Sequence, residues 1–217
     1  MRRFDTVLFD LDGTLLDTLE DLLDAANYTL RELGYSERTL AEMRTFVGNG
    51  AEMQLRRALG AAADDETVRR ALEIYKPYYA AHCQIKTHPY PGVIGLMGEL
   101  KRRGFRMAIV SNKPDEAVKL LAAECFRGLA DTAMGETATR RRKPAPDMPN
   151  DALAELGADK ARAVYVGDSE VDIQTARNAG MACISVCWGF RDWEQLVAAG
   201  AGEIAANADE LLALLDS

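Results

Sequence analysis

The sequence has little of what several classes of protein depend on. Its 217 residues include two histidines and four cysteines, and the cysteines form neither a C-x-x-C pair nor a framework of the secreted, disulfide-bonded kind. The spacing of His82, Cys83 and His88 matches no zinc-binding pattern. Reduced thiols are therefore the better interpretation of the four cysteines.

Basic surface and long apolar runs are also missing. Acidic residues outnumber basic ones by 34 to 26, giving a net charge of −8 and a pI near 4.9, so we expect no broad basic surface for nucleic acid or an anionic membrane. The longest apolar runs are far shorter than a membrane span, and the N-terminus has no signal-type apolar region. We expect a cytoplasmic protein, monomeric or homodimeric, that binds neither nucleic acid nor membrane.

What is present is enough for a full core. Hydrophobic residues make up 48% of the chain, which suffices for one domain or two small ones. Short apolar runs typical of buried strands alternate with helical periodicity, which predicts an α/β fold with a doubly wound, Rossmann-like parallel sheet. The strands are expected at 7–9, 105–110, 131–134, 163–166 and 182–186, and the helices at 93–103, 114–124, 147–156 and 171–178.

One segment interrupts this alternation. Residues 18–80 show helical periodicity almost throughout, with glycines between the helices and no strand pattern. Asp17, followed three positions later by Glu20, predicts a capping box at the start of the first helix. We therefore expect an inserted α-helical bundle, a cap domain over 17–83, within a core made of 1–16 and 84–217.

Polar side chains follow three of the expected strands. Asp10 and Asp12 come after the first strand, Ser111-Asn112-Lys113 after the second, and Asp168 after the fourth, with Asp172 one helical turn later. Because the carboxyl ends of parallel strands meet at one edge of a sheet, these side chains should converge there, and Lys143 should join them. So many carboxylates in one place predict a bound cation, and hard oxygen ligands favour Mg²⁺.

These elements have the order and spacing found in the haloacid dehalogenase superfamily, which the chain resembles along essentially its whole length. The matching stretches are D-L-D-G-T-L-L-D-T at 10–18, Ser111-Asn112, Lys143 in K-P-A-P, and G-D-S-E-V-D at 167–172. Within the superfamily the chain is most similar to phosphoglycolate phosphatases. That closer similarity comes from F-V-G-N-G at 46–50, with Arg44 just before it, and from D-I-Q-T-A-R-N-A-G at 172–180.

The resemblance implies a phosphate monoester hydrolase that acts through an aspartyl-phosphate, on 2-phosphoglycolate or a similar small phosphorylated metabolite. Asp10 would be the nucleophile, and Asp12 would be the general acid and base. Ser111 and Lys143 would hold the transferring phosphoryl oxygens. The inserted helices would act as a mobile lid that selects the substrate.

The resemblance also implies the ligands of the metal and of the substrate. Mg²⁺ would be bound by the side chains of Asp10 and Asp168 and by the backbone carbonyl of Asp12, with Asp172 bound directly or through another ligand. The expected substrate-binding residues are Gly13, Thr14 and Asn112 in the core and Arg44, Gly48, Asn49 and Gly50 in the insertion.

Single elements allow other interpretations. A D-x-D sequence on its own is often a solvated loop. It could also be a calcium-binding loop, but such a loop needs glycine at the position that Leu15 occupies. Ser111-Asn112 could cap the following helix, Lys143 could be one solvated charge in the run 140–143, and Arg44 could lie on an exposed helix face. For the whole chain, a sugar-phosphate mutase resembling β-phosphoglucomutase and a receiver-type domain that retains its phosphoryl group remain as alternatives. The joint occurrence of the four matching stretches favours the hydrolase.

Overall fold

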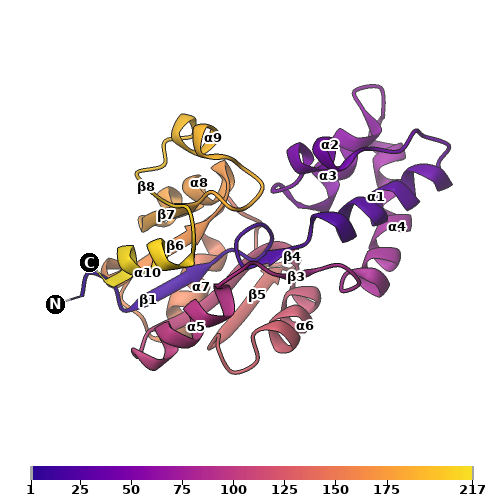
Figure 1. Ribbon diagram of the computed structural model, residues 1–217. Helices are drawn as coiled ribbons and strands as arrows, with labels where there is room; N and C mark the ends of the chain where they lie inside the picture. The colour runs from indigo at the N-terminus through magenta and orange to yellow at the C-terminus, as the bar shows by residue number, and fades with distance from the viewer. Residues whose placement is uncertain (1, 217) are drawn as a thin grey trace. The chain divides into compact units, whose positions relative to one another are not determined.

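A computed structural model describes residues 2–216 of the chain, which form two compact units (Figure 1). One unit contains the residues up to 16 and those from 89 on, and the other contains 17–88. The second boundary thus follows His88, not residue 83 as expected. The reason is a set of hydrogen bonds within the helical unit, in which the N–H groups of Lys86 and Thr87 donate to the Asp21 carboxylate at 3.0 and 2.9 Å.

The larger unit is built on a parallel sheet. Within the described residues the sheet has six strands in the order β5-β4-β1-β6-β7-β8, and every pairing is parallel. This confirms the predicted doubly wound α/β fold. The strands are β1 (Thr6–Phe9), β4 (Arg106–Pro114), β5 (Thr132–Glu136), β6 (Ala163–Gly167), β7 (Ala182–Val186) and β8 (Glu203–Ala205).

Helices cover both faces of this sheet. The cores on the two faces alternate along β1, since Val7 and Phe9 pack into one and Leu8 into the other. Burial on both sides explains why the strands read as continuous apolar runs. Three helices pack in the first core, α5 (Val93–Arg102), α6 (Asp115–Cys125) and α10 (Ala208–Asp216), and two in the second, α7 (Asp147–Leu156) and α8 (Glu170–Ala179).

The strand order places β1 where the direction of winding reverses. From β1 the chain adds β4 and then β5 on one side, and it returns to the other side of β1 for β6, β7 and β8. In open parallel sheets, ligands bind at the carboxyl edge beside such a reversal. Phe9 is in register with Val166, so Asp10 and the end of β6 come out together at that edge.

Several elements were not predicted. After β7 the chain adds α9 (Trp193–Ala198), β8 and α10, and the short helix η1 (Lys160–Arg162) precedes β6. The strand expected to end at residue 110 continues as β4 to Pro114, with a shift in its register to β5 between Val110 and Pro114. Two short strands, β2 (Leu16–Asp17) and β3 (His88–Pro89), pair in a separate sheet.

The smaller unit is helical, as predicted. Its helices are α1 (Leu19–Glu32), α2 (Leu40–Phe46), α3 (Gly50–Leu59) and α4 (Asp65–His82). The predicted capping box of α1 is wrong: Thr18 is the N-cap residue, and Asp17 instead accepts the Leu19 N–H at 3.2 Å. A capping box does begin α2, where Thr39 and Glu42 bind each other's backbone N–H groups. Between residues 2 and 216, no helix combines the length and the apolar character needed to cross a membrane.

Candidate active site

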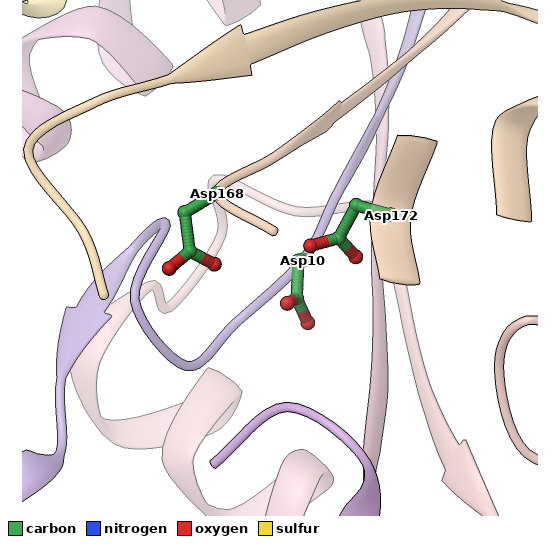
Figure 2. A group of neighbouring side chains, drawn as sticks. All are labelled: Asp10, Asp168 and Asp172. Atoms are coloured by element: carbon green, nitrogen blue, oxygen red, sulfur yellow. The ribbon is translucent and has the colours of Figure 1, made fainter. Parts of the chain in front are cut away.

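Three buried aspartates meet at the carboxyl edge of the sheet. Asp10 follows β1, Asp168 follows β6, and Asp172 lies in the first turn of α8. One carboxylate oxygen from each lies within 4.8 Å of the others. Figure 2 shows the three side chains extending into the same region from these separate elements. The sequence argument for converging acids is therefore supported for these three residues.

The electrostatics of this group are strongly perturbed. Burial, and then the charge of Asp172, raise the pKa of Asp10 well above its usual range and raise the pKa of Asp168 to about 7. Burial lowers the pKa of Lys143, but the charges of Asp10 and Asp172 outweigh burial and raise that pKa well above its ordinary value. Lys143 Nζ lies 2.7 Å from Asp10 Oδ1 and 2.8 Å from Asp172 Oδ1.

One lysine charge does not balance three carboxylates. The three carboxylates lie close together and have Lys143 as their shared cationic partner, so a further positive charge among them would be favourable. All three donors are hard carboxylate oxygens, which suits Mg²⁺ better than a soft metal. The residues present therefore fit a divalent cation.

Asp12 is held apart from this group by residues of β4. Its Oδ1 lies 2.8 Å from Lys113 Nζ, and its Oδ2 accepts a hydrogen bond from the Ser111 hydroxyl at 3.3 Å. The Lys113 backbone N–H donates to the same hydroxyl oxygen at 3.2 Å. The two aspartates of D-x-D thus have different lysine partners, Asp10 with Lys143 and Asp12 with Lys113. No role was predicted for Lys113 from the sequence, although this lysine directly follows Ser111-Asn112.

The loop after β1 is built closely around Asp168. Gly13 has φ +87°, and a Cβ added there would lie 2.3 Å from Asp168 Oδ2, so only glycine fits. Asp168 accepts hydrogen bonds from the Thr14 hydroxyl at 3.4 Å and from the Phe190 N–H at 2.7 Å. Trp188 Nε1–H donates to the Thr14 carbonyl at 3.0 Å. Trp188 and Phe190 were not predicted, because nothing local marks them as neighbours of this loop.

Asn112 fixes the main chain of Lys143. Its Oδ1 accepts the Lys143 N–H at 2.6 Å, and its Nδ2 donates to the Lys143 carbonyl at 3.1 Å. The alternative in which Asn112 caps the next helix is wrong, since the N-cap of α6 is Pro114 and has no side-chain cap. Lys143 is 3% exposed, so it is not a solvated member of its basic run either.

The four predicted substrate-binding residues of the insertion lie in the helical unit. Arg44 is exposed in the last turn of α2, and Asn49 is the N-cap residue of α3. Gly48 and Gly50 on either side of Asn49 have φ +111° and +79°, which favours glycine at both positions. The role predicted for these residues stays a prediction.

Comparison with known proteins defines the class to which this fold and site belong. The family model described as haloacid dehalogenase-like hydrolase matches residues 7–186. The chain therefore belongs to the haloacid dehalogenase-like hydrolase family.

Individual relatives indicate which kind of hydrolase within the family this chain resembles. The chain is 36% identical over 190 residues to the phosphoglycolate phosphatase of Pseudomonas savastanoi pv. phaseolicola, covering 85% of this chain and 70% of that protein. It is 32% identical over 215 residues to the phosphoglycolate phosphatase of Vibrio parahaemolyticus, covering 95% and 93%. The protein is accordingly a phosphoric monoester hydrolase of this family, similar to phosphoglycolate phosphatases, as its sequence predicted.

Solved structures agree with this placement. The crystal structure of a proposed phosphoglycolate phosphatase from Lactobacillus delbrueckii subsp. bulgaricus is 41% identical, with a TM-score of 0.95 and full coverage of both chains. CbbY from Rhodobacter sphaeroides, crystallised with xylulose-1,5-bisphosphate, is 27% identical, with a TM-score of 0.77 over 99% of this chain and 100% of that one.

Proposed function

We propose that the protein hydrolyses 2-phosphoglycolate, or a similarly small phosphorylated metabolite, in a Mg²⁺-dependent reaction through an aspartyl-phosphate on Asp10. The observation that carries the proposal is the placement of the Asp10 carboxylate, 2.7 Å from Lys143 Nζ and grouped with the buried carboxylates of Asp168 and Asp172. The names of the relatives support the substrate. Those relatives are phosphatases, and the mutase alternative is therefore not kept.

The proposed reaction has two displacements at phosphorus. In the first, a carboxylate oxygen of Asp10 attacks, and the bond from phosphorus to the ester oxygen breaks while Asp12 gives its proton to that oxygen. In the second, a water oxygen attacks phosphorus and Asp12 takes the proton of the water. The bond from phosphorus to Asp10 then breaks and phosphate leaves. An intermediate on Asp10 divides one difficult displacement into two easier ones.

The remaining polar residues would hold the phosphoryl group and the cation. Lys143 neutralises charge on Asp10 and on the phosphoryl oxygens. The Ser111 hydroxyl, which donates to Asp12 Oδ2 in the structure, would turn to donate to one of those oxygens when the substrate binds. Asp10, Asp168 and Asp172, with the backbone carbonyl of Asp12, would hold Mg²⁺. When bound, Mg²⁺ supplies positive charge that offsets the negative charge of the acids and of the phosphate.

In the same proposal, the helical unit is the cap that selects the substrate. It is inserted directly after the loop that carries Asp10 and Asp12, so its residues join the chain close to the proposed chemistry. Arg44 would bind the substrate's carboxylate with two parallel hydrogen bonds, which a guanidinium does well. The backbone N–H groups around Asn49 would assist it.

The proposal is tested with purified protein and Mg²⁺ by measuring phosphate release from a panel of esters. The panel contains 2-phosphoglycolate, sugar phosphates, xylulose-1,5-bisphosphate, nucleotides and pyrophosphate. We expect turnover of 2-phosphoglycolate, and a fall in kcat of about four orders of magnitude or more in Asp10→Asn. Asp5→Asn is the matched control. Asp5 lies just before β1 and pairs with Arg106 and Arg162, away from the three buried aspartates, so this variant should keep its activity.

Two results would count against the proposal in different ways. If Asp10→Asn keeps a tenth of the wild-type kcat, Asp10 is not the nucleophile. If the wild type hydrolyses other esters but not 2-phosphoglycolate, the phosphatase class stands and this substrate is removed.

Location and assembly belong to the same proposal. All four cysteines are free thiols, which suits a reducing compartment such as the cytoplasm. We expect a monomer or a homodimer, and light scattering during size-exclusion chromatography at assay concentration measures which one forms.

A further inference from the structure

Lys113 is a buried cation in the strand that carries Ser111 and Asn112. Its side chain is 4% exposed, and its Nζ lies 2.8 Å from Asp12 Oδ1. Burying an ammonium group is costly unless it is paired, and a neutral side chain would be easier to bury at this position. The pairing with Asp12 therefore calls for a functional explanation.

The contacts of Asp12 orient its carboxylate. Lys113 Nζ engages one carboxylate oxygen, the Ser111 hydroxyl engages the other, and the Lys113 backbone N–H donates to that hydroxyl. When the Ser111 hydroxyl turns to the phosphoryl group, the Lys113 ammonium group still holds Asp12 Oδ1 and limits rotation of the carboxylate. Lys143 does not share this work, since its Nζ lies between Asp10 and Asp172.

We propose that Lys113 is a positioning residue that aims the Asp12 carboxyl group at the ester oxygen of the substrate. This inference rests on the proposed function, because it assumes that Asp12 gives a proton to the leaving group. Lys113 acts through Asp12 and need not touch the phosphoryl group.

The proposal predicts a dependence on the leaving group. When the phosphorus–oxygen bond breaks, the electron pair stays on the ester oxygen. An alkoxide or phenoxide then needs the proton of Asp12, whereas p-nitrophenoxide is a good leaving group without it. Misplacing Asp12 should therefore slow transfer from 2-phosphoglycolate and phenyl phosphate much more than transfer from p-nitrophenyl phosphate.

Two other roles for Lys113 predict different results. A lysine that binds the phosphoryl oxygens would matter equally for every ester, because all of them share that group. A lysine that only stabilises the fold would change the unfolding temperature and leave the relative rates of the esters unchanged.

The experiment compares Lys113→Met with wild type on the three esters. The quantity measured is kcat/KM, which covers only the steps up to release of the first product and so excludes hydrolysis of the intermediate. We expect a fall of at least ~30-fold for 2-phosphoglycolate and phenyl phosphate, which is part of the roughly 10²- to 10⁴-fold that a well-placed general acid contributes. For p-nitrophenyl phosphate we expect a fall of less than ~3-fold. Lys119→Met, an exposed lysine of α6, is the matched control and should match wild type on all three.

A second variant tests whether Lys113 acts through Asp12. In Asp12→Asn the proton donor is absent, so adding Lys113→Met should cause no further loss that depends on the leaving group. A selective loss of the same size in both backgrounds would overturn the proposal.

The other outcomes are equally decisive. An equal loss on all three esters, or no loss, in a folded Lys113→Met protein overturns the proposal. Lys113→Gln repeats the test if the methionine variant does not fold, and failure of both to fold assigns Lys113 to stability and also overturns it. A wild type that hydrolyses no ester defeats the proposed function and this inference together, whereas the preceding outcomes defeat the inference alone.

Discussion

Replacing Gly13 with alanine tests how closely the loop after β1 must fit Asp168. Gly13 has φ +87°, a backbone conformation that costs an alanine ~1–2 kcal/mol. The new methyl group would lie 2.3 Å from Asp168 Oδ2, and ordinary contact begins at 3.4 Å. The loop or the carboxylate must therefore move by roughly 1 Å. A displacement of this size in a catalytic group lowers the rate by about 10²-fold, and we expect that loss in kcat for 2-phosphoglycolate.

Gly104→Ala is the control that separates the backbone cost from the displacement. Gly104 has φ +79°, and within the described residues nothing lies within 4 Å of an added Cβ. Both variants should lower the unfolding temperature by about 2–4 °C per kcal/mol for a chain of this size. Only Gly13→Ala should lose kcat and need more Mg²⁺ for half-maximal activity. Wild-type kcat and an unchanged Mg²⁺ requirement in Gly13→Ala would refute the close fit between this loop and Asp168.

Three further predictions concern the metal, pH and the cap. Activity should vanish in chelator and return with Mg²⁺. Excess Ca²⁺ should inhibit, because its looser coordination misplaces Asp10. Full activity in chelator, with no metal found by elemental analysis, would contradict this prediction. In chelator, the unfolding temperature should fall as pH rises from about 4 to about 7. The reason is that burial and Asp172 raise the pKa of Asp168 to about 7, so the folded protein holds a proton that the unfolded chain has lost; saturating Mg²⁺ should remove the fall. Arg44→Ala should raise KM for 2-phosphoglycolate by about 10- to 100-fold and leave KM for p-nitrophenyl phosphate nearly unchanged. Equal increases for both esters would make Arg44 a structural residue.

The sheet and its acidic edge could be predicted because each buried strand is visible in the sequence as a short apolar run. Val7 to Phe9 form an apolar run that ends at Asp10, and 163–166 end just before Gly167 and Asp168 in the same way. The parallel pairing of β1 with β6 then brings the two acids together, as the sequence pattern implied. By contrast, β8 has three residues, too few for periodicity to reveal it. Leu211 and Leu215, four positions apart, are a local helical sign of α10 that the sequence does carry.

Contacts between distant residues set the limit of prediction. The boundary after His88 depends on Asp21 binding Lys86 and Thr87, and no local pattern near residue 83 reveals this. In the site, nothing in the local sequence distinguishes Lys113 from other lysines near strand ends, because its contact with Asp12 joins distant parts of the chain. Trp188 is likewise informative only through its hydrogen bond to the loop after β1.

The pair of hydrogen bonds between the Asn112 side chain and the main chain of Lys143 has a consequence for tolerance to mutation. A primary amide carries an N–H donor beside its acceptor oxygen, so the Asn112 side chain binds both the N–H and the C=O of residue 143, as a residue of a neighbouring antiparallel strand would. Aspartate lacks the donor, leucine lacks both groups, and glutamine is one methylene too long. In a library randomised at single positions and selected for activity, position 112 should therefore accept almost as few residues as position 10. Invariance among the active variants would thus not distinguish a residue that holds the main chain in place from a residue that attacks phosphorus.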